Sequence, residues 1–464
     1  MKNMTLREIA AAVNGKLCGD FSDIEAQGVV IDNRKILENY VFIAIKGNRV
    51  DGHDLVNSTY EKGALGAIVE KEGDYNGPYI LVDSTPAALR ALATYYRKCL
   101  TIPVVGIIGS VGKTTTKEMT SSVLSEEYKV LKTEGNLNND MGLPLTILSI
   151  KEEHEVAVVE MGISDFGEMD ILGDIAKPDV VIYTCIGECH LENLHDRDGV
   201  LKAKTEVFKY LTKDATVIVS ADDDKLMTIK ESDLPNGGTI VTYSGIPKDS
   251  DTEPAMYQAV SIDNLGLEGS KVKFAGNVEG EVIVPIPGEH NVKNAMAAVA
   301  AGHVLHESTE HIINGIASFS TIAGRNNFID VNGMTIIDDC YNANPMSMRA
   351  GLSILGKAKG RKIAVLGDMG ELGADEVTLH RDLYMSVIEN NIDIVYTAGD
   401  LSKTIVDALS DTTDFKGVAK AYTGDNAKED LIADLKPTVQ EGDTILVKAS
   451  HFMEFPQIVE ELKR

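Results

Sequence analysis

Residues 103–117, PVVGIIGSVGKTTTK, have the residue types that bind a polyphosphate. An apolar run enters a Gly-Ser-Val-Gly turn, and a helix-type segment then opens at Lys113. Glycines let backbone N–H groups approach phosphate oxygens, and a helix N-terminus adds unpaired donors and a positive dipole end. A lysine supplies a mobile charge, and a threonine hydroxyl can bind Mg²⁺. The pattern therefore predicts a nucleotide-binding loop made of Gly109, Ser110, Val111, Gly112, Lys113, Thr114 and Thr115.

The spacing of this loop is shorter than the full G-x-x-x-x-G-K-[ST] pattern. That pattern needs a glycine at position 107, where the chain has Ile107. The remaining G-S-V-G-K-T also fits an ordinary turn between a strand and a helix. The apolar run before it and the helix-type segment after it favour the phosphate-binding interpretation. By itself the loop predicts a nucleotide and leaves the reaction open.

Polar side chains also follow two other apolar runs at the point where each run ends. Glu160 follows EVAVV, and His190 comes shortly after VIYTCIG. The carboxyl ends of parallel strands meet at one edge of a sheet, so Thr114, Glu160 and His190 are expected in one cleft. Hydroxyl, carboxylate and imidazole groups suit Mg²⁺ ions that bridge ATP phosphates. The alternatives are a helix-capping carboxylate at Glu160 and a hydrogen-bonded loop histidine at His190.

Apolar runs alternate with helix-length segments along the chain of 464 residues, which indicates an α/β protein of several domains. We expect a small α/β domain over residues 1–84. A central domain over 85–318 should have a mostly parallel sheet with helices on both faces. Within it, the turn-rich residues 256–287 predict antiparallel hairpins at the sheet edge. A smaller, doubly wound Rossmann-like domain is expected over 319–464.

The composition bounds the partners and the location. Acidic residues outnumber basic ones by 71 to 44, a net charge of −27, which argues against general nucleic-acid or anionic-membrane binding. No apolar run approaches the ~18 residues of a membrane helix. The N-terminal segment is an amphipathic helix pattern in which Thr5 and Glu8 form a capping box, and it lacks the apolar region of a signal peptide. We therefore expect a cytoplasmic protein without membrane insertion.

Two other motifs suggest sites that the spacing does not support. Cys185 and Cys189 are followed by His190, but no second ligand pair completes a zinc site. The segment GDMGELG, which starts at Gly367, has G-x-x-G-x-x-G spacing rather than that of a dinucleotide-binding loop. Scattered cysteines, odd in number, indicate reduced thiols.

For two further stretches, the residues alone do not decide the function. Asp32-Asn33-Arg34 follows a strand end, and Arg34 could hold a phosphate or carboxylate with two hydrogen bonds or lie solvated at the surface. Residues 199–211, GVLKAKTEVFKYL, form a helix pattern whose lysines would ordinarily be solvated.

Together these motifs resemble the Mur ligases, the ATP-dependent amide-forming enzymes of bacterial cell-wall precursor synthesis. The resemblance covers the whole chain and accounts for the shortened loop. The DNR and DGH segments of the first domain are similar to the family's uridine-nucleotide domain, where Asn33 replaces the usual Ser. The GNLNND segment is similar to a substrate-side motif. This implies a substrate-binding set of Asp32, Arg34, Asn136, Asn138 and Asn139.

The resemblance also implies roles for residues elsewhere. HNVKNA implies Asn294 near the nucleotide, Gly324-Arg325 implies an arginine that reaches the phosphates, and DDCYNANP implies a functional Asp339. Glu160 and His190 are implied as metal ligands beside Thr114. Lys204, in A-K-A-K-T-E, matches the lysine that CO₂ carbamylates to give a further Mg²⁺ ligand. The implied catalytic set is Lys113, Glu160, His190, Lys204 and Arg325.

GDMGELG and the absence of a D-N-P-R motif resemble the branch of the family that adds D-alanyl-D-alanine to UDP-muramoyl-tripeptide. The implied reaction uses ATP and two Mg²⁺ ions, passes through an acyl phosphate and releases ADP and phosphate. The segment VKASH departs from the usual K-G-S-R at Ala449 and His451. We expect a monomer. The alternatives are another Mur-type or folylpolyglutamate-synthase-like ligase, a P-loop ATPase or kinase, and a non-catalytic nucleotide-binding module.

Overall fold

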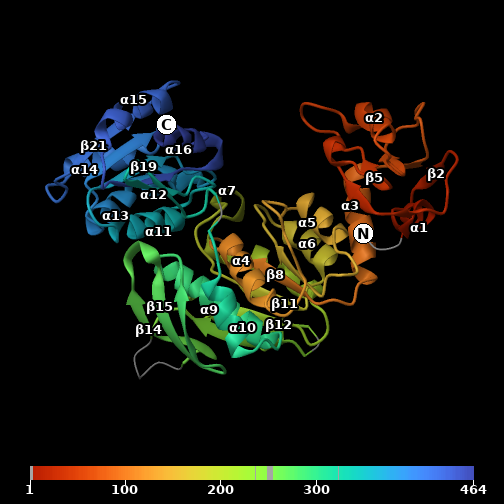
Figure 1. The fold of residues 1–464 in the computed structure, drawn as a ribbon, viewed down its shortest axis with the longest axis horizontal. Helices are drawn as coiled ribbons and strands as arrows, with labels where there is room; N and C mark the ends of the chain where they lie inside the picture. Colours follow the sequence, from red (N-terminus) through yellow and green to blue (C-terminus); the bar gives the residue numbers. More distant parts are fainter. Residues whose placement is uncertain (1–3, 236, 248–253, 322) are drawn as a thin grey trace.

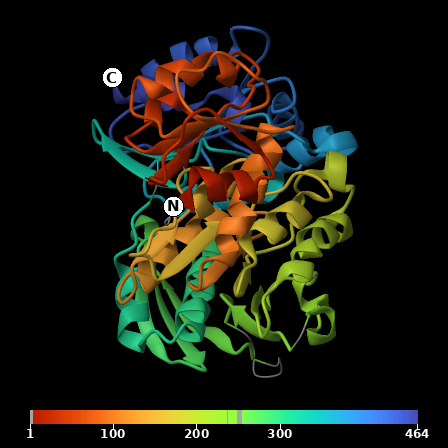
Figure 2. The same ribbon diagram turned by 90° about the vertical axis from the view of Figure 1, so that its right-hand side faces the viewer.

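The computed structural model describes residues 4–235, 237–247, 254–321 and 323–464. Three α/β blocks, each with a main sheet, follow one another along the chain. In Figure 1 the first and the last block stand at opposite ends of the central one, and both lie on the same side of it. The view in Figure 2 agrees, because there the first and last blocks overlap above the central block. The expected boundaries at residues 84/85 and 318/319 fall between elements of neighbouring blocks and stay predictions.

The N-terminal block has a five-stranded sheet in the order β2-β7-β6-β5-β4, parallel except for β2. A pair of short strands, β1 and β3, and two helices complete it. The capping box predicted at Thr5 and Glu8 is confirmed, because Glu8 N–H donates to Thr5 Oγ1 and Thr5 N–H donates to Glu8 Oε2. The elements are β1 (Met4–Thr5), α1 (Leu6–Ala12), β2 (Lys16–Cys18), β3 (Glu25–Ala26), β4 (Gly28–Val30), β5 (Tyr40–Ile43), α2 (Val56–Tyr60), β6 (Gly66–Val69) and β7 (Tyr79–Leu81).

The central block has a nine-stranded sheet in the order β16-β15-β14-β13-β12-β11-β8-β10-β9. The strands from β14 to β9 are parallel, and β14, β15 and β16 form the predicted antiparallel hairpins at one edge. The strands are β8 (Val104–Ile108), β9 (Val130–Lys132), β10 (Val156–Glu160), β11 (Val180–Tyr183), β12 (Thr216–Ser220), β13 (Thr239–Ser244), β14 (Tyr257–Asn264), β15 (Ser270–Gly276) and β16 (Gly280–Val284).

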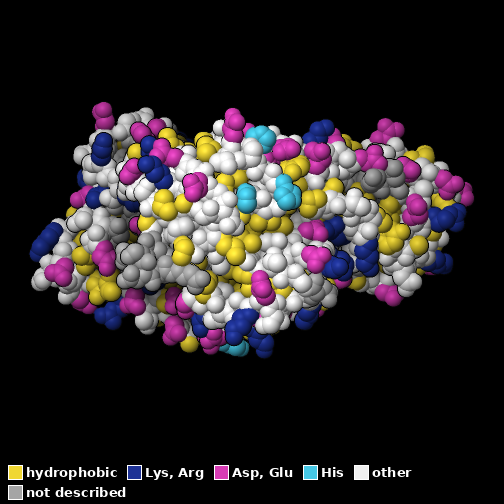
Figure 3. Space-filling view, turned by 90° about the horizontal axis from the view of Figure 1, so that it is seen from below, with side chains coloured by type: hydrophobic (Ala, Val, Ile, Leu, Met, Phe, Trp, Pro, Cys, Tyr) yellow, Lys and Arg dark blue, Asp and Glu magenta, His cyan; other side chains and the backbone are white. Residues whose placement is uncertain are grey.

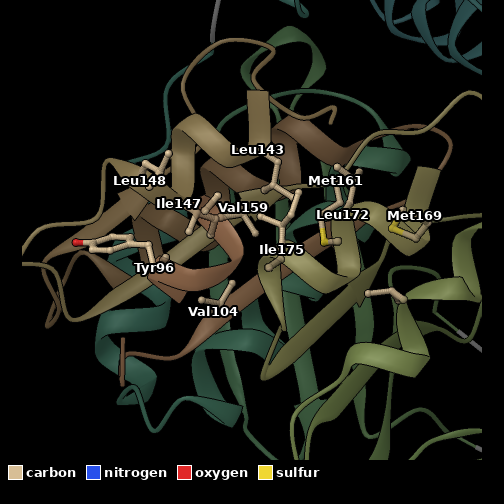
Figure 4. Packing of buried hydrophobic residues seen from close by; sticks show 14 of the residues in the cluster. Tyr96, Val104, Leu143, Ile147, Leu148, Val159, Met161, Met169, Leu172 and Ile175 are labelled. Atoms are coloured by element: carbon tan, nitrogen blue, oxygen red, sulfur yellow. The ribbon is translucent and has the colours of Figure 1, made fainter. Parts of the chain in front are cut away.

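Helices cover both faces of this sheet because its strands are apolar on both faces. Val104 packs on one side with α3, α5 and α6, whereas Val105 packs on the other with α4, α9 and α10. Figure 4 shows the first of these layers, where Tyr96 of α3 and Ile147 of α5 lie over the sheet. The helices are α3 (Thr85–Lys98), α4 (Lys113–Leu124), α5 (Gly142–Leu148), α6 (Glu168–Ala176), α7 (Leu191–Leu194), α8 (Arg197–Lys204), α9 (Glu289–Val304) and α10 (Thr309–Ala317).

The C-terminal block has a six-stranded sheet in the order β17-β18-β22-β19-β20-β21, parallel except for β17. Helices α15 and α16 cover one face, and α11, α13 and α14 cover the other. Its elements are β17 (Asn327–Val331), β18 (Met334–Asp338), α11 (Pro345–Gly356), β19 (Lys362–Gly367), α12 (Glu376–Arg381), α13 (Leu383–Glu389), β20 (Ile394–Ala398), α14 (Lys403–Asp411), β21 (Val418–Tyr422), α15 (Ala427–Thr438), β22 (Thr444–Lys448) and α16 (Pro456–Lys463).

One predicted helix differs from the structure. The pattern over residues 199–211 predicts one continuous helix, but α8 ends at Lys204 and a 3₁₀ helix, Thr205–Tyr210, follows. Thr205 Oγ1 donates back to Leu201 O and Lys202 O, at 2.9 and 3.1 Å. Such back-bonding by a threonine competes with the regular α-helical pattern, and the chain tightens there.

Arg97 near the end of α3 bonds to the segment that connects α6 with β11. Its Nε donates to Ala176 O at 2.8 Å, and one Nη lies 2.9 Å from Asp179 Oδ2. Replacing Arg97 with Ala should lower the free energy of unfolding by about 2 kcal/mol or more, since the carbonyl of Ala176 loses a charged donor and half-buried Asp179 loses its ion pair. Arg90→Ala is the matched control, because the ion pair of Arg90 with Asp140 is half-exposed and should contribute less than about 1 kcal/mol. Urea unfolding measures the free energy of unfolding of both variants. Equal decreases would contradict a larger contribution of Arg97 to stability.

Over the face shown in Figure 3, acidic and basic side chains are interspersed. The described residues there form no broad basic area of the kind that nucleic acid would require. No helix in the described part of the chain is long and apolar enough to cross a bilayer.

Candidate functional site

The loop after β8 presents backbone and side-chain donors at the carboxyl edge of the central sheet. Gly112 caps α4 in the left-handed conformation with φ 84°, which glycine adopts without strain. Lys113 Nζ donates to Gly109 O at 2.9 Å, so this side chain folds back along the loop. A Cβ on Gly112 would lie 2.6 Å from Asn294 Oδ1, so the loop lies directly against α9.

Glu160 at the end of β10 is 1% exposed and accepts hydrogen bonds from neutral partners on both oxygens. Thr114 Oγ1 donates to Oε2 at 2.8 Å, and Asn138 Nδ2 donates to Oε1 at 2.9 Å. Among the described residues Glu160 forms no ion pair. A buried carboxylate with only neutral partners favours a nearby cation, so the donor set fits a divalent ion such as Mg²⁺.

A cavity of about 390 Å³ lies between the central and C-terminal blocks. It brings together most of the residues predicted for the nucleotide, the metal and the substrate. They come from the loop, from the ends of neighbouring strands, from α9 and from the third sheet. The predicted residues that line it are Ser110, Val111, Gly112, Lys113, Thr115, Asn138, Asn139, Glu160, His190, Asn294, Arg325 and Asp339.

His190 lies at the rim between two blocks. Its Nδ1 is 2.5 Å from Glu371 Oε2, although the approach lacks the geometry of a hydrogen bond. This contact holds the pKa of Glu371 below its usual value. Glu371 belongs to GDMGELG, so this segment touches the loop around His190. No local sequence pattern predicts this pairing, because it depends on how the blocks pack.

Lys204 is 1% exposed and does not line the cavity. Burial, together with the charge of Lys113, lowers the pKa of Lys204 to about 8. Tyr183 Oη donates to Lys204 O at 2.8 Å and fixes this end of α8 against β11. The residue-level expectation of a solvated lysine is therefore wrong at this position.

The C-terminal block contributes Arg325 and Asp339. The Arg325 guanidinium stacks over the ring of Tyr341, 3.8 Å from its centroid. Asp339 Oδ2 lies 2.5 Å from Nζ of Lys448, which is 2% exposed and also donates to Asn342 O. Lys448 ends the apolar run TILVK, and a lysine at the end of a predicted strand is the sequence signal that could have found it.

The structure does not bring all the predicted substrate residues together. Asn138 and Asn139 line the cavity, but Asn136 is exposed outside it. Asp32 and Arg34 lie in the N-terminal block, where the guanidinium of Arg34 pairs with Asp32 at 2.7 Å. This bond holds the pKa of Asp32 at about 2.

His290 is a further cavity residue that carries no role in the sequence-based prediction. It opens the HNVKNA segment near the start of α9. Burial and the nearby charges of Lys357, Lys448 and Lys293 lower the pKa of His290 to about 4, so the imidazole is neutral near pH 7.

Gly112→Ala should weaken nucleotide binding at least ~10-fold, because the new Cβ collides with Asn294 and displaces the loop. Gly167→Ala is a matched control. Gly167 caps α6 at φ 80°, and a Cβ there would meet nothing within 4 Å. Both variants should lose about 1–2 kcal/mol of stability from the left-handed backbone. Calorimetric titration with ADP compares them, and equal affinities would contradict the role of the loop.

Comparison with known proteins supports the division of the chain into three blocks. Family models described as "Mur ligase family, catalytic domain", "Mur ligase middle domain" and "Mur ligase, glutamate ligase domain" match residues 25–104, 107–302 and 324–451. The UDP-N-acetylmuramoyl-tripeptide–D-alanyl-D-alanine ligase of Bacillus subtilis is 36% identical, with 100% of this chain and 99% of that protein covered. The Escherichia coli ligase of that name is 31% identical, with the same coverage.

Solved structures agree over almost the full length. The MurF crystal structure from Acinetobacter baumannii superposes with a TM-score of 0.87 at 32% identity, covering 99% of this chain and 98% of that one. The MurF ligase of Thermotoga maritima in complex with ADP gives a TM-score of 0.79 at 28% identity, covering 94% and 97%. From its three matched segments and its full-length relatives, we conclude that the chain belongs to the Mur ligase family.

Proposed function

We propose that this chain joins D-alanyl-D-alanine to UDP-N-acetylmuramoyl-tripeptide at the expense of ATP. The product is the UDP-muramoyl-pentapeptide of peptidoglycan synthesis, with ADP and phosphate released. The observation that carries the proposal is similarity along the full chain to relatives of 30–36% identity that bear this ligase name. The meeting of the ATP-type loop with Arg325 and Asp339 in one cavity supports the ATP-dependent ligase chemistry.

In the first step, an oxygen of the tripeptide's terminal carboxylate attacks the γ-phosphorus of ATP. The bond from that phosphorus to the bridging oxygen breaks, and ADP leaves. Lys113 and Arg325 would neutralise the charge on the transferring phosphoryl group. The product of this step is an acyl phosphate.

In the second step, the amine of D-alanyl-D-alanine attacks the acyl carbon and loses a proton, and phosphate leaves with its bond to carbon broken. Closure of the outer blocks over the cavity would keep water from the acyl phosphate. Scattering profiles recorded with and without all ligands test this closure, and indistinguishable profiles would count against it.

Thr114, Glu160, His190 and Lys204 would hold the two Mg²⁺ ions. Bound Mg²⁺ supplies positive charge that stabilises the phosphoryl oxygens. Lys204 would serve as a carbamate. Its buried amine has a lowered pKa, and only a neutral amine can attack CO₂. Electron density at Lys204 in a crystal grown with bicarbonate tests the modification.

Phosphate release with each substrate omitted in turn tests the proposed function. We expect release only when ATP, UDP-muramoyl-tripeptide and D-alanyl-D-alanine are all present. Release with ATP alone would indicate an ATPase, and release with glutamate and a folate would indicate the folylpolyglutamate-type ligase. No release with any combination would indicate a nucleotide-binding module.

A further inference from the structure

Three potential metal ligands meet in the central block at the end of α4 that lies away from the nucleotide loop. Glu127 follows the C-terminus of α4, Glu307 lies between α9 and α10, and His311 is in the first turns of α10. One ligand atom from each lies within 4.8 Å of the other two. His311 Nδ1 is 2.8 Å from Glu307 Oε2 and 3.7 Å from Glu127 Oε2. Figure 1 shows α4, α9 and α10 packed side by side.

The carboxylate of Glu307 is the unusual member of this cluster. Its side chain has no exposed surface, and among the described residues its Oε1 has no hydrogen-bond partner. A buried carboxylate oxygen without a partner is costly, and His311 accounts only for the other oxygen. Burial raises the pKa of Glu307, as do the charges of Glu127 and Glu126. These surroundings favour the addition of positive charge.

We propose that Glu127, Glu307 and His311 form a binding site for a divalent transition-metal ion, with Zn²⁺ as the best match. One imidazole nitrogen and two carboxylates are ligands typical of Zn²⁺, and three protein ligands leave the fourth position for water. In tetrahedral zinc sites with bonds of about 2.1 Å, neighbouring ligand atoms lie about 3.4 Å apart. The observed 2.8 and 3.7 Å bracket this separation, so small side-chain movements suffice.

The ion would clamp the C-terminal end of α4 to the junction of α9 and α10. Existing bonds already hold this junction: Tyr128 Oη donates to Leu305 O at 3.0 Å, and Glu307 N–H donates to Gly302 O at 2.9 Å. The backbone that carries the ligands is therefore fixed before any ion binds. The site is separate from the cavity at Glu160 and Lys113, so its role would be structural.

Titration of the chelator-treated full-length protein with Zn²⁺, in excess Mg²⁺, tests the site. We expect Glu127→Gln and His311→Gln each to weaken one Zn²⁺ equivalent at least ~10-fold and to reduce the Zn²⁺-dependent rise in melting temperature. Glu126→Gln is the matched control, because it removes the same charge from the neighbouring residue and should leave this equivalent unchanged. Glu127 is half-exposed, so its variant is expected to fold.

Equal Zn²⁺ binding by the wild type, Glu127→Gln and His311→Gln would overturn the proposal and leave a histidine–carboxylate pair only. Equal weakening by Glu126→Gln and Glu127→Gln would also overturn it, because a general effect of negative charge would then explain both. Replacing Zn²⁺ with Co²⁺ gives a spectroscopic readout. Absorption typical of nitrogen and oxygen ligands that disappears in His311→Gln supports the site, whereas thiolate bands alone point to the cysteines and overturn it.

Discussion

Lys113→Met should lower the rate of phosphate release by about 10³-fold or more. The substitution keeps an unbranched side chain one atom shorter than lysine and removes the charge that would face the transferring phosphoryl group. The loop loses the bond from Lys113 Nζ to Gly109 O, but it keeps the left-handed turn at Gly112, which does not depend on that side chain. ADP affinity should therefore fall much less than turnover. Initial rates at saturating substrates, together with calorimetric titration with ADP, separate the two effects.

Lys213→Met is the control for this variant. The side chain of Lys213 is 80% exposed on the central block and faces no part of the cavity, so its loss should leave the rate unchanged. A Lys113→Met enzyme that keeps wild-type turnover would contradict the role assigned to the loop. Equal losses of ADP affinity and turnover would instead assign Lys113 to binding of the ground state.

Lys204→Met should have two opposite effects: lower activity and higher stability. Loss of the carbamate would remove a Mg²⁺ ligand, and the rate should fall at least about 10²-fold. Near pH 7 the folded wild type must bury an ammonium group whose pKa falls from 10.5 to about 8. That difference corresponds to about 3 kcal/mol, which the methionine variant should gain in CO₂-free buffer.

The sign of the pH dependence follows from proton binding. Between pH 8 and 10.5 the unfolded chain holds a proton at Lys204 that the folded chain has released. The free energy of unfolding contributed by this group therefore rises with pH in that window, and below it the full penalty applies. The advantage of Lys204→Met should shrink as the pH rises from 7 to 9. Urea unfolding at several pH values measures this, with Lys202→Met, an exposed change in the same helix, as control. A constant advantage would contradict the lowered pKa.

Local sequence patterns predicted the elements whose signal lies within a short stretch of the chain. The capping box at Thr5 and Glu8 starts α1, and apolar runs locate the central strands, because side chains facing both helix layers must be apolar. The same reasoning missed β17, an edge strand that pairs only with β18, and α10, whose apolar face becomes clear only against α4 and β16. Some strands end before the apolar run does. The run VIYTCIG continues to Gly187, whereas β11 ends at Tyr183.

The candidate site likewise has residues that could be predicted from the sequence and contacts that could not. Polar residues at strand ends placed the loop beside Glu160, and the family resemblance added Asn294. The pairing of Glu371 with His190 and the contact of Cys185 with Met346 could not, because they depend on the packing of two blocks far apart in the sequence. Burial of Lys204 was hidden because it depends on how α8 packs against β11 within the central block. Its segment has an ordinary amphipathic pattern, and only the fold places that lysine inside.

The most direct test is a complete reaction with UDP-muramoyl-tripeptide that carries ¹⁸O at both oxygens of its terminal carboxylate. If one of these oxygens attacks the γ-phosphorus, mass spectrometry should find one ¹⁸O in each phosphate released, together with a pentapeptide product that has lost one label. This transfer should require D-alanyl-D-alanine for turnover. Phosphate without the label, or product formed without ATP, would contradict the account of an acyl-phosphate ligase.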